Sequence, residues 1–545
     1  MRVDYLPAGI VREEHLRRMK MKKLIIAVMV IYAVLILASC TTSTSSSTTR
    51  VTASTAPSAN ASGTSGLAYE LINNGTAYRV SKGTVTSGEV RIPDSYNGLP
   101  VREIGNNAFL STRITSIYIP ASVTSFDAKS VFNNCARLNS ITVAPDNPNY
   151  ASEGGILYDK AKINLILAPQ DISGNIVIPE GVRAIGSNAI SICAKITGIT
   201  IPASVRVIGG YTRVTDTGTT TVTSKNLFDR CTSLASITVD PNNPYYTSES
   251  GILYDKAKAW LIRAPEGISG TFTIPAGVTN ISQNAFSSCT RLTGITIPEG
   301  VGSFGEYAFY LCTSLTSIHI PASVRTICAG YNISNKNPFT GCTSLASITV
   351  APNNPNYSTE GGILYNKSKT TLEIAPPAGI SGNVTIPASV RSLESGAFYG
   401  CASLTSIVIP EGVRTIGYSV FNQCTRLASI TIPASVTSIG NYAFENCTSL
   451  IRIIIPAGVT SIGSSAFYNC TSLTSVTIHE GVTSIGSSAF AVCTSLTSIT
   501  IPSSVTSIEG YAFSRCSNLR TVTVSRKTTI GTGAFPDTAR ITYSD

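Results

Sequence analysis

The sequence predicts a mainly β repeat solenoid, in which the chain winds into stacked coils joined by parallel strands. A cysteine recurs every 23 residues from Cys424 to Cys516, and the segments between these cysteines repeat one order of apolar and small polar residues. Within each copy, stretches such as Val476-Thr-Ile478 alternate with the period of a β-strand. Because units of this length bury their apolar faces only against neighbouring units, we expect one elongated domain.

One coil should contain two short extended segments and a turn. Residues 473–478 form the first strand, which ends at a position that is usually proline, a residue without a backbone donor for the ladder. Residues 482–486 form the second segment and end at a glycine. The Ala-Phe-x-x-Cys segment at 489–493 is too short for an independent α-helix. We therefore expect one helical or 3₁₀ turn that buries Phe490 and Cys493, as part of a stack with a coil spacing of about 4.8 Å.

The outward position of the first strand is mostly threonine. The expected ladder consists of Thr142, Thr200, Thr238, Thr296, Thr349, Thr431, Thr477, Thr500 and Thr523, and it is interrupted by Tyr118, His319, Val408 and Ile454. Extended solenoids usually bind on a stacked concave face. We therefore predict that the part of the ladder formed by Thr431, Ile454, Thr477 and Thr500 belongs to a binding surface.

The unit Leu-x-x-Ile-x-Ile-Pro-x-x-Val-x-x-Ile-Gly-x-x-Ala-Phe-x-x-Cys resembles the BspA-like, or treponemal-type, leucine-rich repeat. The resemblance covers about residues 67–540, and the Ala-Phe element recurs with variants from Ala108-Phe109 to Ala534-Phe535. It implies a right-handed leucine-rich-repeat coil. It also implies a bacterial cell-surface protein that attaches to host proteins, to cells or to other bacteria, without assigning that binding to particular residues.

The amino-terminal segment has the features of an export signal with a lipid anchor. Residues 1–39 combine basic residues with an apolar core, and Met19 and Met21 are alternative starts that would place residues 1–18 or 1–20 outside the protein. The segment ending in Leu-Ala-Ser before Cys40 resembles a bacterial lipobox, which predicts lipidation of Cys40. A transmembrane anchor is the alternative, but the apolar run is shorter than the roughly 20 residues a span needs.

A tether, two caps and the repeats follow the leader. Residues 40–66 are the lipidated cysteine and a Ser/Thr-rich tether that cannot pack a core. Residues 67–109 are the expected amino-terminal cap, with a hairpin that turns at Asn74-Gly75. The repeats occupy residues 110–535, and residues 536–545 form the carboxy-terminal cap.

Three long inserts interrupt the repeats, at about residues 145–179, 241–275 and 352–387. Each contains an Asn-Pro turn, an Ile-Leu-Tyr segment and a second apolar run that ends in Ala-Pro, which predicts a β-hairpin. The turn residues could be interpreted as a calcium loop, but they lack the Asp-x-Asp-x-Asp-Gly register. Turn chemistry explains the asparagines better.

Two shorter insertions lie between the second strand and the turn of a coil. The separation of Ile208 from Phe228 is 20 residues, and that of Ile327 from Phe339 is 12, where five is usual. These loops, with Tyr211 and Tyr331, should project from one edge. Loops on a rigid scaffold are favoured places for recognition, and tolerated surface insertions are the alternative explanation.

The composition and the motifs give no indication of an enzyme, a cofactor or a metal site. His319 and His479 are read as exposed variants, and the chain has no His-Glu-x-x-His, Walker or Gly-x-Ser-x-Gly motif. The cysteines recur singly, without the Cys-x-x-Cys pairs of zinc sites. Without residues 1–39 the formal net charge falls from +10 to +6, from 33 Lys/Arg against 27 Asp/Glu. This excess is not clustered as nucleic-acid binding requires.

The cysteines of the coils could form disulfides or remain free thiols. Export permits disulfides, and the coil spacing would allow the Cα separation. A ladder points all of its Cβ atoms in the same direction, however, whereas a bridge needs two that converge. We therefore expect buried free thiols that pack as small hydrophobes.

Together these features predict an exported lipoprotein of the bacterial envelope, attached through its lipid to the outer membrane or cell surface. Its expected function is that of an adhesin for host matrix proteins, cell-surface proteins or other bacteria. The alternative is an envelope or biofilm scaffold whose Ser/Thr ladders bind polysaccharide. The expected partners are extracellular proteins or glycans, and neither a nucleic acid nor a small-molecule substrate is expected.

Overall fold

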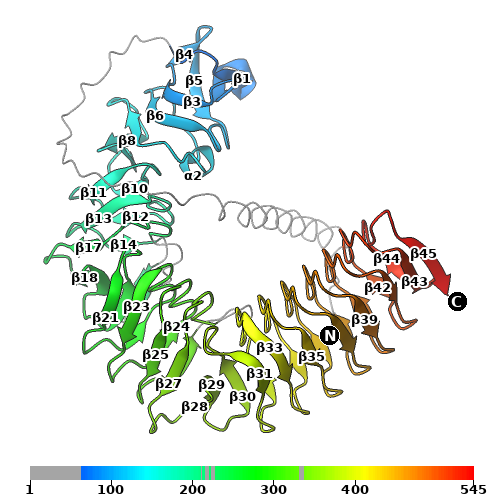
Figure 1. Ribbon diagram of the computed structural model, residues 1–545. Helices are drawn as coiled ribbons and strands as arrows, with labels where there is room; N and C mark the ends of the chain where they lie inside the picture. Colours follow the sequence, from blue (N-terminus) through cyan, green and yellow to red (C-terminus); the bar gives the residue numbers. More distant parts are fainter. Residues whose placement is uncertain (1–62, 210–211, 215–219, 223–227, 330–336, 545) are drawn as a thin grey trace, which may run out of the picture. The chain divides into compact units, whose positions relative to one another are not determined.

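The computed structural model describes residues 63–209, 212–214, 220–222, 228–329 and 337–544. These residues form the predicted β solenoid, in which coil follows coil in chain order (Figure 1). Within these ranges, no helix combines the length and the apolar character needed to cross a membrane.

Parallel pairing between equivalent residues of successive coils builds the solenoid. Ile453 pairs with Val476 between the first strands of two coils. Ile462 pairs with Ile485 between their second strands. Residues that are 23 positions apart therefore lie side by side, as the period of the sequence predicts.

The first strands pair in groups of two or three. They are β3 (Ser87–Arg91), β6 (Arg113–Ile119), β7 (Ser140–Val143), β11 (Ser173–Val177), β13 (Lys195–Ile201), β17 (Ser236–Val239), β21 (Ser269–Thr273), β23 (Arg291–Thr296), β25 (Ser317–Ile320), β27 (Ser347–Val350), β31 (Ser381–Thr385), β33 (Ser403–Val408), β35 (Ser429–Thr431), β37 (Arg452–Ile455), β39 (Ser475–Ile478), β41 (Ser498–Thr500), β43 (Thr521–Ser525) and β45 (Arg540–Ser544).

The second strands are shorter but form longer sheets. They are β12 (Ala184–Ile185), β14 (Val207–Ile208), β22 (Asn280–Ile281), β24 (Ser303–Gly305), β26 (Thr326–Ala329), β32 (Ser392–Leu393), β34 (Thr415–Ile416), β36 (Ser438–Ile439), β38 (Ser461–Ile462), β40 (Ser484–Ile485), β42 (Ser507–Ile508) and β44 (Thr529–Ile530). A separate hairpin, β15 (Thr212–Val214) and β16 (Thr220–Val222), lies in the first of the two loop insertions.

A hairpin begins the described chain. Its members are β1 (Ala68–Ile72), η1 (Asn73–Gly75) and β2 (Ala77–Ser81), joined by β4 (Ser95–Tyr96) and β5 (Leu99–Ile104) in one sheet. The strands β1 and β2 are antiparallel and turn at Asn74, whose φ of 57° is left-handed, so the predicted hairpin is confirmed. Because β2 pairs in parallel with β5, the hairpin continues the second-strand stack.

The Ala-Phe segment differs from the predicted helical turn. Among the described residues an α-helix forms only at α2 (Ala128–Val131), and the other copies are hydrogen-bonded turns with left-handed residues such as Tyr442 (φ 59°) and Asn446 (φ 61°). The backbone N–H of Phe444 donates to the Ala466 carbonyl of the next coil at 2.7 Å. The N–H groups of Glu445 and Cys447 bond within the turn, to the carbonyls of Tyr442 and Phe444, with the three-residue spacing of the predicted 3₁₀ alternative. The N–H groups between them join neighbouring coils instead, so no continuous helix forms.

The core consists of ladders of apolar side chains, with a stack of phenylalanine rings at its turn side. The rings of Phe444, Phe467 and Phe490 lie 5.0 Å apart and nearly parallel, and all three side chains are fully buried. The thiol of Cys470 donates to the Phe444 carbonyl. The twelve coil cysteines are buried and unbridged, in agreement with the predicted free thiols.

Each long insert is a three-stranded meander. Its strands are β8 (Tyr150–Glu153), β9 (Ile156–Asp159) and β10 (Asn164–Leu167) in the first insert, β18 (Tyr246–Glu249), β19 (Ile252–Asp255) and β20 (Trp260–Arg263) in the second, and β28 (Tyr357–Glu360), β29 (Ile363–Asn366) and β30 (Thr371–Ile374) in the third. The predicted hairpin between β9 and β10 is confirmed, and β10 also pairs in parallel with β12. The last strand of the insert therefore takes the place of a second strand in the stack.

The asparagines of the inserts act through turn chemistry, as predicted. Asn147 is fully buried, and its amide donates to the carbonyls of Pro120 and Val123 in the preceding coil, each at 2.8 Å. Its side-chain oxygen accepts from the N–H groups of Asn149 and Tyr150. Asn243 and Asn354 repeat this arrangement. The side chain is thus fully used in pinning the insert to the coil before it.

Candidate binding surfaces

The candidate ladder residues Thr431, Ile454, Thr477 and Thr500 occupy the outward position on four successive first strands. All four are exposed, and Ile454 keeps 55% of its surface accessible although it is apolar. Its neighbours Ile453 and Ile455 point into the core and are buried, which is the alternation of a strand with one solvated face. The structure thus places these residues on one face, where their side chains are not needed by the core.

A second exposed row runs beside this ladder, two residues earlier in each strand. Ser429, Ser475 and Ser498 belong to it, and Arg452 pairs in register with Ser475. Hydroxyl groups both donate and accept hydrogen bonds. The two rows therefore offer a polar surface of low charge density, to which Arg452 adds a cation beside Ile454.

The ladder is longer than the sequence indicated. Five further outward positions are paired in register with it: Arg91, Val177, Thr273, Thr385 and Thr542. Three of these, Val177, Thr273 and Thr385, lie near the end of an insert, where a Ser-Gly segment replaces the Leu-x-x-Ile pattern of the strand. An Ile-Pro dipeptide directly follows Arg91, Val177, Thr273 and Thr385, and this was the signal that could have identified these four positions.

Two parts of the predicted site and the predicted anchor lie outside the described residues. These are Tyr211, Tyr331 and Cys40. The two described histidines of the repeats, His319 and His479, are exposed on different coils, and His319 Nδ1 lies 2.9 Å from the hydroxyl of Thr349. They are surface variants, as expected. Among the described residues, no group of three or more His, Cys, Asp or Glu side chains could hold a metal ion.

A buried ion pair lies at the second insert. Arg263 Nη2 is 2.9 Å from Glu266 Oε1, and both side chains are about 2% exposed. Burial raises the pKa of Glu266 to about 7 although the Arg263 cation acts in the opposite direction. Glu266 also accepts from the backbone N–H of Arg230. The pair therefore joins the insert to the preceding turn, and it lies too deep to meet a ligand.

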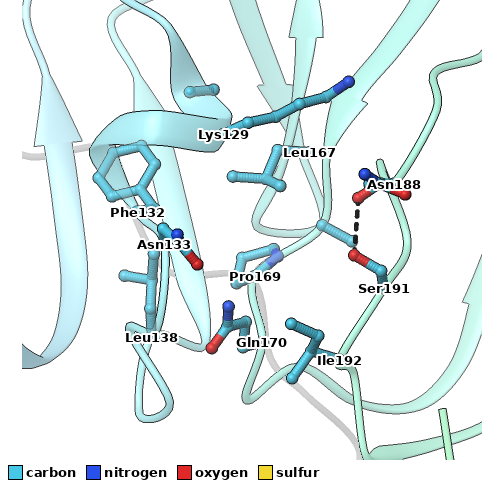
Figure 2. Close-up of a pocket in the computed structure, with 12 residues that line it drawn as sticks. Lys129, Phe132, Asn133, Leu138, Leu167, Pro169, Gln170, Asn188, Ser191 and Ile192 are labelled. Atoms are coloured by element: carbon cyan, nitrogen blue, oxygen red, sulfur yellow. Dashed lines mark hydrogen bonds between the residues drawn. The ribbon is translucent and has the colours of Figure 1, made fainter. Parts of the chain in front are cut away.

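An open cavity of about 240 Å³ lies beside α2 and β10. Figure 2 shows its labelled lining: Phe132, Leu138, Leu167, Pro169 and Ile192 supply apolar surface, and Lys129, Asn133, Gln170, Asn188 and Ser191 supply polar groups. Ser191 Oγ donates to the Asn188 carbonyl at 3.0 Å. Nothing in the repeat pattern indicated this cavity, because it arises where the first insert replaces a regular turn.

With this architecture in view, the sequence defines the class of protein. A profile of the BspA type leucine rich repeat region matches six copies, over residues 86–174, 174–251, 269–376, 380–466 and 437–544. The chain therefore belongs to the BspA-type leucine-rich repeat family.

Several solved structures resemble the chain. A leucine rich cell surface protein from Faecalibacterium prausnitzii shares 24% identity, with 90% of this chain and 96% of that one covered and a TM-score of 0.33. A leucine-rich repeat protein from Eubacterium ventriosum shares 24% identity over 74% of this chain and 93% of that one, with a TM-score of 0.37. The pneumococcal vaccine antigen PcpA shares 17% over 88% and 92%, with a TM-score of 0.35. No protein in the curated set matches.

Proposed function

We propose that the protein is a lipid-anchored adhesin of the bacterial cell surface that binds host matrix proteins, cell-surface proteins or other bacteria. Its family membership supports a repeat scaffold with a binding role and without catalysis. The leader and the lipobox-like segment before Cys40 support export and anchoring. The Ser/Thr-rich residues 40–66 would hold the solenoid away from the membrane.

The observation that carries the proposal is the exposed ladder. The outward side chains of Thr431, Ile454, Thr477 and Thr500 repeat on successive coils, while their neighbours along each strand are committed to the core. A stacked face of this kind is large and already ordered, so binding does not have to fix the backbone. Its hydroxyl groups and low charge suit a broad, polar contact of modest affinity, to which the Tyr211 and Tyr331 loops would add selectivity.

A second candidate function is an envelope or biofilm scaffold that binds polysaccharide. The two rows of hydroxyls on the first strands favour it, because sugars are recognised through hydrogen bonds to their own hydroxyl groups. The partner would then be a glycan, at the same face.

One binding experiment separates these functions. Soluble residues 67–545 are tested by surface plasmon resonance against a panel of matrix proteins and a panel of glycans. Saturable binding to a matrix protein supports the adhesin, and binding confined to glycans supports the scaffold. Binding to neither panel, by protein with native circular dichroism, contradicts both the binding of matrix proteins and the binding of glycans.

A further inference from the structure

The cavity beside α2 and β10 lies where a phenylalanine ring is missing from the core. In a regular coil, the N–H of the phenylalanine donates to the alanine carbonyl of the next coil, as Phe444 does to Ala466 at 2.7 Å. In the first insert the N–H of Ala168 donates to the carbonyl of Ala189, also at 2.7 Å. Ala168 therefore stands at the ring position. A methyl group replaces the ring, and Pro169 ends the turn early.

The other two inserts have the same substitution but fill the gap from within the chain. Ala264 and Ala375 donate to the next coil at 2.7 Å in the same way. At the second insert, Arg263 bonds Glu266 and the Asn284 carbonyl, and the side chains of Arg263 and Glu266 are both buried at this position. At the third, Ile374 and Pro377 are buried instead.

The first insert has no equivalent pair of buried side chains at these two positions. Leu167 and Gln170 stand at the positions of Arg263 and Glu266, and both line the open cavity of about 240 Å³. Figure 2 shows Phe132, Leu167 and Pro169 around it, with Lys129 extending along its edge. The ring of Phe132 stacks on Phe109 at 6.3 Å. The aromatic stack of the first coils therefore stops at this opening.

We propose that this cavity binds an aromatic side chain of a protein partner, next to an acidic residue of that partner. An engineered apolar cavity of about 150 Å³ already holds benzene, so this larger one can admit a phenyl or indole ring beside Phe132. Aromatic pairs add attraction beyond the buried area. The amides of Asn133, Gln170 and Asn188 can bond a peptide backbone, and Lys129 is the one charged side chain among the lining residues.

This inference adds a second contact to the proposed adhesin and depends on its having a protein partner, but it does not depend on the ladder. The direct test uses N-acetyl-Asp-Trp-amide, N-acetyl-Lys-Trp-amide and N-acetyl-Asp-Leu-amide, titrated into the full-length chain by ligand-observed NMR. We expect the Asp-Trp probe to bind at least tenfold more tightly than the Asp-Leu probe. Equal affinities, or binding of free indole without binding of the Asp-Trp peptide, would overturn the proposal.

The second insert provides a matched variant. Leu167→Arg together with Gln170→Glu copies the pair that closes the equivalent gap, and it should weaken the Asp-Trp probe at least tenfold. Lys129→Met should instead remove the preference for Asp-Trp over Lys-Trp. Unchanged affinity in the double variant, with native circular dichroism, would contradict the site.

A crystal soak keeps the test independent of these variants. With 4-bromophenol, anomalous density for bromine is expected between Phe132 and Ile192, and density only at other places would refute the assignment. The variant in which Thr431, Thr477 and Thr500 are all lysine should bind the Asp-Trp probe like the wild type. The proposal for the ladder and the proposal for the cavity can therefore be tested independently of each other.

Discussion

Glu266 is a carboxyl group whose titration should be measurable in the stability of its surroundings. Its pKa of about 7 exceeds the ordinary value because burial outweighs the attraction of Arg263 and Arg230, and Asp229 raises it further. Between about pH 4.5 and 7 the native state thus holds a proton that the unfolded state has released, so stability falls as pH rises through this window.

Glu266→Gln should remove this dependence. We expect the free energy of local opening around residues 228–290 in the wild type to drop by about 1–3 kcal/mol from pH 5 to pH 8, and to change much less in the variant. Hydrogen exchange, corrected for the intrinsic rate at each pH, measures it. A wild-type segment that becomes more stable on going to pH 8 would refute the prediction.

The cysteines of the repeats are expected to be free thiols, in contrast to the lipidated Cys40. Of the 14 cysteines, all except Cys40 should be free, which leaves thirteen. Burial raises the pKa of the Cys447 thiol well above its ordinary value, so this thiol should alkylate slowly in the native protein. Denatured, non-reduced mature protein should titrate with close to thirteen thiols in Ellman's assay. A value below about half of that would indicate disulfides.

Cys40 is expected to carry lipid. Cys40→Ser should block acylation and shift the protein from the membrane fraction, because the lipid is the expected anchor. Mass spectrometry of the amino-terminal peptide and membrane fractionation measure both effects. The idea fails if the dominant wild-type peptide recovered from membranes contains unmodified Cys40.

At the scale of one element, the coil is the unit of local stability. Phe467 is fully buried between two rings at 5.0 Å, so Phe467→Ala should destabilise its coil by about 3–5 kcal/mol. Because coupling in a solenoid runs between neighbouring repeats, hydrogen exchange should rise around residues 440–500 and remain unchanged near Phe132. A uniform loss of protection along the chain would contradict this picture.

The elements also show where sequence patterns mislead. The Ala-Phe-x-x-Cys segment has the composition of a helical turn, but alternate N–H groups, such as those of Phe444 and Asn446, bond the next coil. That choice depends on a neighbouring coil at the right distance, which no local pattern contains. The hairpins of the inserts were predictable because their strands lie close together in the sequence and are separated by turn residues.

At the scale of the whole molecule, binding should depend on many weak contacts along the ladder. Replacing Thr431, Thr477 and Thr500 together by lysine adds three charges to a face of low charge, and leaves the inward side chains unchanged. We expect at least a tenfold loss of affinity for a ligand identified by the panel, measured by surface plasmon resonance. The matched control is the deletion of residues 212–224.

Two outcomes of that comparison are informative. If the triple variant folds normally and binds with unchanged affinity while the deletion abolishes binding, the loops carry the function and the ladder does not. If only the triple variant loses binding, the face of Thr431, Ile454, Thr477 and Thr500 is the contact surface.

The sequence by itself determined the period, the strands and the face to which each ladder residue belongs. Alternation sends Ile453 inward and Ile454 outward whatever the neighbouring coil contains, and the 23-residue period then aligns Ile454 with Thr477. These properties depend on local alternation or on a strict repeat, so they can be recognised in the amino-acid sequence alone.

Only the tertiary structure decided what happens where the repeat is broken. Ala168 was recognisable as a residue before a proline, but its place in the phenylalanine stack follows from the hydrogen bond to Ala189 in the next coil. Likewise, Leu167 and Arg263 occupy equivalent positions in the first two inserts. Leu167 lines an open cavity, whereas Arg263 is buried in an ion pair with Glu266. The physical reason is that packing across an interrupted turn depends on the volumes of side chains brought together from separate coils.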